Sequence, residues 1–275
     1  MKKCSFLFSI LLYYGNFCRK VVLILSENKK KPLLFKIIKS TIRFFYPKIE
    51  VIGMENIPDE PCVIVGNHTQ LHGPISSELF FPDTFYTWCA AQMMELKEVP
   101  AYAYTDFWSQ KPKILHPFFK AVAYLIAPLS VVIFNNARTV PVYYDSRILT
   151  TLRESIKKLT EGNNIVIFPE RDKKHNNIVY EFQEGFVDVA KLYHRRTGTE
   201  LSFVPLYIAP KLRRMYIGKP IRFSANAPIA DERRRICDAL MAEITDIARG
   251  LPEHVVVPYR NIPKRLYPKN TDKEA

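Results

Sequence analysis

Residues 62–68 read CVIVGNH, four apolar residues followed by a glycine, an asparagine and a histidine. A short, continuous apolar run that ends at a turn signal is typical of a strand buried on both faces. Gly73 and Pro74 come soon afterwards and predict the start of a helix that continues to Phe80. The chain therefore passes from a buried strand to a helix through a polar turn that contains His68.

The same alternation of strands and helices continues along the chain. The apolar run at residues 117–134 predicts a buried or membrane-facing helix that kinks or ends at Pro128. A final helix is expected with Asp231 as its cap. Further strands are expected at residues 85–90, 164–168 and 203–208, and further helices at residues 149–159 and 185–193.

This pattern predicts an α/β fold with a mostly parallel central sheet flanked by helices. In such sheets ligands bind beyond the carboxyl ends of the strands. His68 and Glu170 both stand just after a predicted strand. We therefore expect them at the same edge of the sheet.

Positive charge is concentrated at the start of the chain. The 275 residues carry a formal net charge of +13, and the first fifty hold eleven lysines and arginines against two glutamates. Each basic cluster precedes an apolar run, which favours anionic lipid over nucleic acid as the partner. In residues 32–45, apolar residues recur at helical spacing opposite Lys36, Lys39 and Arg43. This pattern fits a helix in a lipid interface and also a helix docked on the protein's own core.

Three parts are expected from these features. Residues 1–48 form a basic, membrane-associating helical arm, residues 49–250 form the α/β domain, and residues 251–275 form an irregular or loosely held tail. The apolar run from Cys4 is interrupted before it reaches the length of a membrane span, and no signal-peptide cleavage site follows it. Five scattered cysteines indicate a reducing compartment.

The spacing of His68 and His72 is that of a metal-binding pair on a helix. Gly73 and Pro74 follow immediately and interrupt any continuous helix there, and Thr69 excludes an H-E-x-x-H motif. We therefore expect no metal site.

Four short motifs, in this order, resemble those of the glycerolipid acyltransferase family, which includes the lysophosphatidate acyltransferases. Residues 65–68 (VGNH) resemble the strand end that opens the family's H-x-x-x-x-D motif. Residues 168–170 (FPE) resemble its Phe-Pro-Glu-Gly, and residues 182–186 (FQEGF) its F-K-x-G-x. Residues 203–208 (FVPLYI) and 217–221 (IGKPI) are similar to its V-P-V strand and I-G-x-P-I. Four ordered motifs are more specific than any one of them.

The chain also departs from the family pattern. Gly73 stands where the family has the motif aspartate, and Arg171 replaces the glycine of Phe-Pro-Glu-Gly. Tyrosines stand near residues 141–145, where the family's second-block arginine is expected, so that Arg138 or Arg147 would have to substitute for it. The aspartate would orient the imidazole and stabilise its charged form, and its loss predicts a weaker base unless Glu78 or Glu170 supplies the charge from elsewhere in the fold.

The resemblance implies a role for each candidate residue. His68 would be the base that deprotonates an acceptor hydroxyl, and His72 would be a second catalytic candidate with a structural or relay role. Glu170, Arg171 and Arg138 would bind the acceptor, with Glu170 helping to build the pocket for its phosphate.

The implied reaction is O-acyl transfer at the cytoplasmic face of a membrane. The donor would be acyl-CoA or acyl-ACP, the acceptor a lysophospholipid or a glycerol-phosphate-like molecule, and no bound cofactor is expected. The alternative is a catalytically weak or inactive lipid-binding protein of the same fold.

Overall fold

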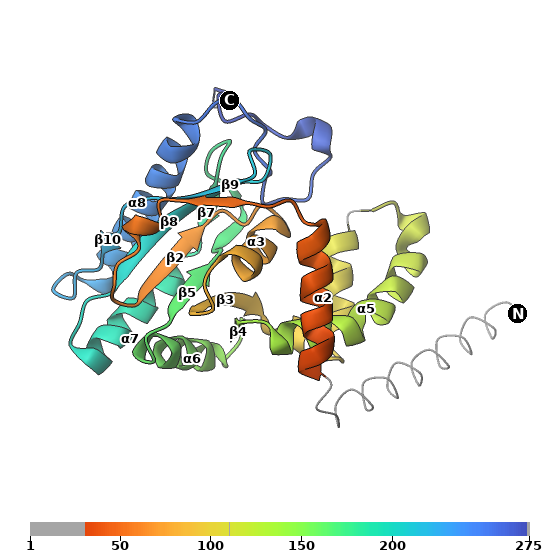
Figure 1. Ribbon diagram of the computed structural model, residues 1–275, viewed down its shortest axis with the longest axis horizontal. Coiled ribbons are helices and arrows are strands. Elements are labelled where there is room, and N and C mark those ends of the chain that lie inside the picture. Colours follow the sequence, from red (N-terminus) through yellow and green to blue (C-terminus); the bar gives the residue numbers. More distant parts are fainter. Residues whose placement is uncertain (1–30, 110, 274–275) are drawn as a thin grey trace, which may run out of the picture. The chain divides into compact units, whose positions relative to one another are not determined.

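The computed structural model describes residues 31–109 and 111–273, which belong to two compact units (Figure 1). Unit 1 contains residues 31–45 and 89–142, and unit 2 contains residues 46–88 and 143–273. The basic clusters predicted to bind lipid at residues 1–30 lie outside the described residues. The domain boundaries predicted at residues 48 and 250 stay a prediction.

Unit 2 is built on a sheet whose strands lie in the order β1-β9-β8-β2-β5-β3, with β10 also paired to β8. The neighbours of β2 and β5 are all parallel, whereas β9 and β10 run antiparallel to β8. The predicted mostly parallel sheet is therefore confirmed. The strands are β1 (Glu50–Ile52), β2 (Cys62–Gly66), β3 (Phe85–Ala90), β5 (Asn164–Ile167), β8 (Ser202–Ala209), β9 (Arg214–Ile217) and β10 (Ile221–Arg222).

Both faces of this sheet are covered, as its continuously apolar strands require. All five residues of β2 are buried. Ile64, Val166 and Val204 belong to one core cluster on the sheet, together with Phe81 and Phe85. α6 contacts β5, and α8 contacts β8 (Figure 1). The helices of unit 2 are α3 (His72–Phe80), α6 (Ile148–Thr160), α7 (Asp188–Thr197) and α8 (Ile229–Arg249).

Two features of unit 2 differ from the sequence prediction or were not predicted. The cap of α8 is Pro228, and Asp231 lies inside the first turn, so the predicted cap was wrong. A proline is suited to this position because its fixed backbone angle leads into a helix and its missing N–H is not needed there. A two-stranded hairpin, β6 (Glu170–Lys174) and β7 (Tyr180–Phe182), directly follows the Phe-Pro-Glu motif.

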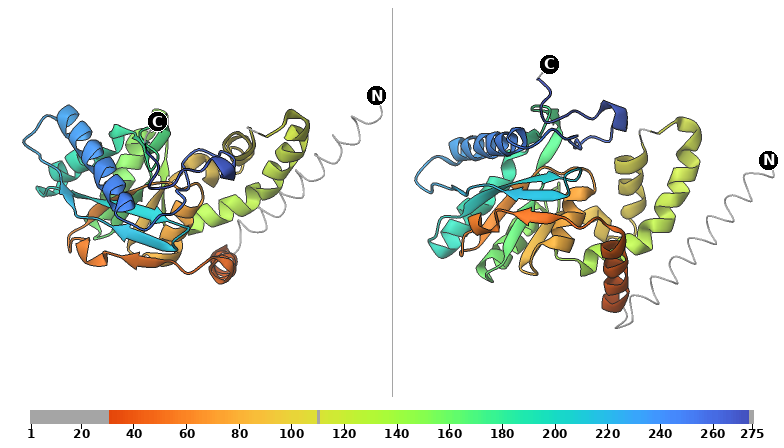
Figure 2. Two further views of the ribbon diagram at one scale, coloured as in Figure 1. Left: turned by 90° about the horizontal axis from the view of Figure 1, so that it is seen from above. Right: turned by 45° about the horizontal axis from the view of Figure 1, so that its top comes forward.

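Residues 251–273, which we call the C-terminal strap, are irregular as predicted but are not loosely held (Figure 2, dark blue). Asn270 is buried, and its side chain accepts from His254 N and donates to Ala248 O, each at 2.8 Å. Nε2 of buried His254 lies 2.7 Å from the hydroxyl of Tyr207, in β8. Buried polar side chains that are fully hydrogen-bonded fix a segment that has no regular structure.

Unit 1 is mainly helical and contains α2 (Lys31–Phe45), α4 (Val99–Ala103), α5 (His116–Asn136) and the strand β4 (Thr139–Val142). Its small core includes Val99 and Ala103 of α4 and Ala127 of α5. α5 does not end at Pro128, which is buried inside the helix. α2 contacts α5 (Figure 1).

Many apolar side chains of unit 1 are exposed. On α2, Leu34, Ile38 and Ile42 are half-buried, whereas Leu33, Ile37, Phe44 and Phe45 are exposed. On α5, the exposed apolar residues include Phe118, Tyr124, Leu125 and Leu129. Within the described part of the chain, one helical stretch, Lys113–Asn136, has the length and apolar composition of a membrane span.

Candidate active site

His68 is held at the carboxyl end of β2 by the side chain of its neighbour Asn67. The Asn67 Oδ1 accepts from Ile208 N at 2.8 Å, and its Nδ2 donates to Ile208 O at 3.1 Å. This buried amide continues the pairing of β2 with β8 by one further residue after the strand has ended. The backbone can therefore turn at His68 without leaving the polar groups of β8 unsatisfied.

Glu170 joins the turn after β2 to the β6–β7 hairpin. Its Oε2 accepts from His68 N at 2.5 Å, and its Oε1 accepts from Tyr180 N at 2.7 Å. The side chain is only 3% exposed, and this burial raises the pKa of its carboxyl to about 7 against the opposing effect of the two amide donors. Glu170 thus binds the backbone of His68 rather than its imidazole.

The turn from His68 to Gly73 has an unusual backbone. Thr69 has a φ of 46° and Gln70 a φ of 56°, a left-handed conformation that non-glycine residues rarely adopt. Each such residue costs of the order of 1 kcal/mol or more and persists only where the surrounding structure enforces it. Here the turn closes through Gly73 N, which donates to His68 O at 3.1 Å.

Gly73 leaves no room for a side chain, and so none for the aspartate that the resemblance would place there. A Cβ atom added to Gly73 would lie 2.5 Å from the carbonyl oxygen of His68 and 3.1 Å from Cε1 of Phe168. The first distance is far below a normal contact, and it involves backbone rather than a flexible side chain. The glycine and the path of the turn therefore depend on each other.

The imidazole of His68 has aromatic rather than acidic neighbours. Its ring centroid lies 5.6 Å from that of Phe168 and 5.7 Å from that of Tyr259, both in edge-to-face geometry. Nδ1 is buried and makes no hydrogen bond with any residue in the described part of the chain. Burial lowers the pKa of His68 to about 4, against smaller opposing effects of the backbone of Gln70 and of His68 itself. The ring is therefore neutral near pH 7 and is a weak base.

His72 begins α3 and takes part in a different hydrogen-bond network. Its Nδ1 lies 2.8 Å from the hydroxyl of Tyr46, which in turn lies 3.2 Å from the Ser76 Oγ. Burial, followed by the positive charges of Lys211 and Lys264, lowers the pKa of His72. Its Nδ1 is thus directed at Tyr46, and this network holds the start of α3.

The predicted binding arginines lie in different places. Arg171 is an exposed residue of β6 and forms an ion pair with Glu181, which also pairs with Lys173 at 3.0 Å. Arg138 belongs to unit 1, between α5 and β4. Arg147, the other substitute considered, pairs with Asp145 at 2.8 Å and lies over the ring of Tyr143. Unit 2 therefore brings His68, Glu170 and the β6–β7 hairpin together.

The sequence did not predict that the ring of Tyr259 contacts His68. Tyr259 belongs to the C-terminal strap, and its ring also lies 5.8 Å from that of Tyr180. The one available signal was the apolar run Val255–Val257 just before it, because such a run indicates a tail that is packed rather than free.

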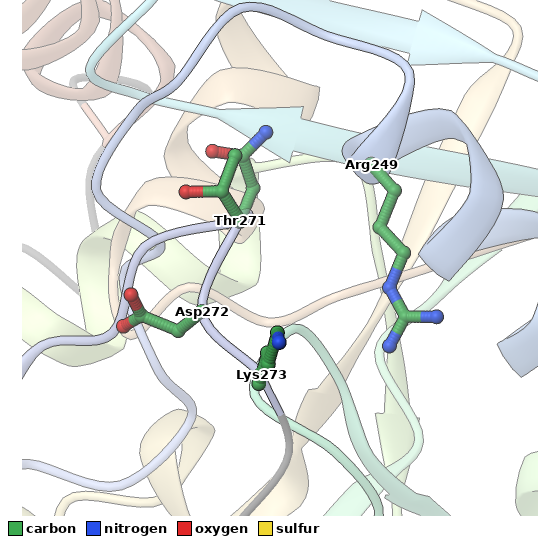
Figure 3. Close-up of a pocket in the computed structure, with 5 residues that line it drawn as sticks. Arg249, Thr271, Asp272 and Lys273 are labelled. Atoms are coloured by element: carbon green, nitrogen blue, oxygen red, sulfur yellow. The ribbon is translucent and has the colours of Figure 1, made fainter.

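Within residues 31–109 and 111–273, no group of three or more His, Cys, Asp or Glu side chains is arranged to hold a metal ion. A surface pocket lies where the end of the C-terminal strap faces α8 (Figure 3). Its lining contains none of the predicted site residues and consists of Arg249, Asn270, Thr271, Asp272 and Lys273.

The match to a family model agrees with the family predicted from the four motifs. A search of curated proteins gives no match. Among solved structures, the chain is similar to the 1-acyl-sn-glycerophosphate (LPA) acyltransferase PlsC from Thermotoga maritima, with 18% identity and a TM-score of 0.46, over 90% of this chain and 98% of that one. The family described as Acyltransferase matches residues 48–209, which include His68 and Glu170. Because this match covers more than half of the sequence, the chain belongs to the acyltransferase family.

Proposed function

We propose that this protein transfers a fatty acyl group from an acyl thioester, acyl-CoA or acyl-ACP, to a hydroxyl of a lysophospholipid or glycerol-phosphate-like acceptor. The observation that carries the proposal is the position of His68. It lies beyond the carboxyl end of a central parallel strand, inside the segment that matches the family, with its backbone fixed by buried Glu170. That edge of a parallel sheet is where ligands bind.

In the proposed reaction, His68 accepts the proton of the acceptor hydroxyl through Nε2 as the oxygen attacks the thioester carbonyl carbon. The tetrahedral intermediate then collapses, the carbon–sulfur bond breaks, and the leaving thiolate takes the proton back from His68. No acyl-enzyme forms and no bound cofactor takes part. The low pKa keeps the imidazole unprotonated, and thus able to accept a proton, across the neutral range.

The other predicted site residues receive roles that their contacts support. Glu170 fixes the turn at His68, since both of its oxygens already accept from backbone amides. Arg171 binds the acceptor phosphate by exchanging Glu181 for it, which an exposed ion pair permits at little cost. His72 acts from a distance by holding Tyr46 and the start of α3. Arg138 stays a prediction.

We further propose that unit 1 binds anionic lipid at the cytoplasmic face of a membrane. Burying each exposed large apolar side chain of α2 and α5 in lipid is worth about 1.5–3 kcal/mol. Lys36 and Arg43 are also exposed on α2, and each basic group near an anionic surface adds about 1 kcal/mol. Ala123, Ala127 and Ser130 of α5 are buried within the protein, which favours shallow insertion over a span.

One observation favours the alternative of a lipid-binding protein with little or no turnover. Among the described residues, no carboxylate hydrogen-bonds to the ring of His68, and Gly73 has no room for one. A base without an acid partner loses the stabilisation of its protonated form during the reaction. The two proposals differ in one measurable quantity, the release of thiol.

The deciding experiment supplies acyl-CoA or acyl-ACP to the full chain on anionic vesicles that contain lysophospholipid or glycerol phosphate. Thiol release and the new ester are followed together. His68→Ala should lower the rate by about 10²- to 10⁴-fold, the usual contribution of a general base. His175→Ala is the matched control, because His175 is exposed and has no role in the proposed site. Equal rates for wild type and His68→Ala would contradict the mechanism, and vesicle binding without any turnover would establish the alternative.

A further inference from the structure

The imidazole of His68 needs something to hold its orientation, because a base must keep its proton-accepting nitrogen aimed at the hydroxyl. In a triad that task belongs to a carboxylate hydrogen-bonded to the other ring nitrogen. Here Nδ1 of His68 has no such partner among the described residues. Gly73 cannot supply one, because a Cβ at Gly73 would lie 2.5 Å from the carbonyl oxygen of His68. Another group must fix the ring.

Two aromatic rings meet the imidazole at steep angles, Phe168 at 68° and Tyr259 at 76°. Phe168 belongs to the segment between β5 and β6 and is fixed by the sheet. Tyr259 arrives from the C-terminal strap, well after residue 209, where the match to the family ends. The edge-to-face contacts restrict rotation of the imidazole and cover part of its surface, and His68 is half-buried.

The C-terminal strap is attached on both sides of Tyr259. Its ends are held by the bridge between Val255 and Lys269 and by the hydrogen bonds of Asn270. Between these ends, Gln70 Nε2 donates to Arg260 O at 3.3 Å and to the Tyr267 hydroxyl at 2.9 Å. Gln70 is one of the two left-handed residues of the turn that follows His68. The turn and the strap are therefore fixed together.

The strap is also attached to the other half of the site. Arg260 pairs with Asp172 of β6 at 2.8 Å, and the ring of Tyr259 packs on Tyr180, whose amide donates to Glu170. The residues that fix the backbone of His68 and the residue that contacts its ring thus form one connected set.

We propose that Tyr259 is a positioning residue that orients the imidazole of His68 in place of the missing motif carboxylate, and that the C-terminal strap is a working part of the acyltransferase site. This inference rests on the proposed function. Tyr259 touches neither donor nor acceptor in this scheme, and it acts only through the ring of His68.

The test compares Tyr259→Ala, Tyr259→Leu and Tyr259→Phe by two independent readouts. The first is an NMR titration of the His68 ring protons, assigned by their loss in His68→Ala. Removing the ring of Tyr259 lets more water reach the imidazole of His68. Tyr259→Ala should therefore raise the pKa of His68 from about 4 by at least one unit, whereas Tyr259→Phe should leave this pKa close to that of wild type. An unmoved pKa in a folded Tyr259→Ala protein would overturn the inference, and Tyr259→Leu gives the same comparison if the alanine variant does not fold.

The second readout is the pH dependence of thiol release. Loss of orientation should lower kcat by about 10- to 100-fold, with a smaller change in KM, and should move the acidic limb of the rate profile to higher pH by the same amount as the titration. Tyr259→Phe should restore most of the rate. A lower rate with an unchanged limb would mean that Tyr259 only supports the fold, and would overturn the inference. If wild type releases no thiol while the titration still moves, the proposed function fails but the contact of Tyr259 with His68 stands.

Discussion

Unit 2 and unit 1 treat their apolar side chains in opposite ways. Unit 2 buries them on both faces of a sheet and then covers the carboxyl end of β2 with the strap, so that His68 lies among aromatic rings. Unit 1 exposes large apolar side chains on both α2 and α5. In the proposed function, burial in unit 2 lowers the pKa of His68, and the exposed apolar side chains of unit 1 bind lipid. In that proposal, unit 2 carries the reaction and unit 1 attaches the protein to the membrane.

The largest expected effect concerns the exposed apolar side chains of unit 1. The double substitution Phe118→Glu with Leu125→Glu removes two apolar contacts and adds two negative charges on α5. Binding to anionic vesicles should weaken by on the order of 10³-fold, since each lost side chain is worth about 1.5–3 kcal/mol. Vesicle flotation measures it.

The control for this variant is thermal unfolding without lipid. Both side chains are more than 60% exposed, so the free energy of unfolding should change by less than about 0.5 kcal/mol per site. A large loss of stability with unchanged vesicle binding would show that these faces pack within the protein instead.

The next effect concerns buried Glu170 in unit 2. Glu170→Ala leaves the amides of His68 and Tyr180 buried without an acceptor. Each orphaned donor costs about 1–3 kcal/mol, so the free energy of unfolding should fall by about 4 kcal/mol in a denaturant titration. Glu181→Ala, which removes an exposed ion-pair partner, is the control and should cost under 1 kcal/mol. Similar losses for both variants would contradict the role given to Glu170.

The pH dependence of the free energy of unfolding should show the burial of the His68 imidazole. Its pKa is about 4 in the folded protein and near 6.5 when unfolded, so protons favour the unfolded chain. The stabilisation is complete above pH 6.5 and is lost as the pH falls towards 4, by about 3 kcal/mol in all. Glu170 acts in the opposite direction, because its pKa of about 7 gives stability at low pH that is lost as the pH rises through 7.

The two groups nearly cancel in wild type, so the measurement is a difference. His68→Phe keeps a ring but removes the titration, and the stability of wild type relative to this variant should decline as the pH falls from 7 to 4. A difference that does not change with pH would show that the imidazole is not buried as described.

The smallest effect is expected at Gly73. Gly73→Ala places a methyl group against the carbonyl oxygen of His68, and the turn must shift to accept it. A loss of about 1–3 kcal/mol is expected, as for overpacking elsewhere. Gly185→Ala is the control, because a Cβ at Gly185 meets nothing within 4 Å. Equal stability of the two variants would show that the turn adapts freely.

Elements with a regular apolar period could be predicted from the sequence, and those fixed by single long-range contacts could not. The runs at residues 62–66 and 85–90 became β2 and β3, and the stripe from residue 149 became α6. The hairpin at Glu170 has no such period, since four of the five residues of β6 are exposed. Its position depends on the hydrogen bond between Glu170 and His68, which crosses 102 residues of sequence.

The candidate site also combines features that could be predicted from the sequence with features that could not. The place of His68 at a strand end follows from the apolar run before it, whereas Gly73 indicates only that a carboxylate is missing at that one position. The enclosure by Tyr259 could not be read from the sequence, because the strap is irregular and is held by individual side chains such as His254 and Asn270. The sequence left open whether the helix kinks or ends at Pro128, and the structure continues it to Asn136, because the surrounding core of unit 1 outweighs one lost hydrogen bond.

The contact between Gly73 and the carbonyl of His68 bears on the order in which sequence changes could occur. A single replacement of Gly73 by aspartate would add the missing acid to a turn that has no space for it, so the first effect would be damage rather than gain. A route towards the family's motif must first change the left-handed residues Thr69 and Gln70, and only then the glycine. The substitutions are strongly non-additive in that sense. If the proposed role of Tyr259 is right, the turn separates two ways of orienting the same histidine, one with a carboxylate and one with aromatic rings.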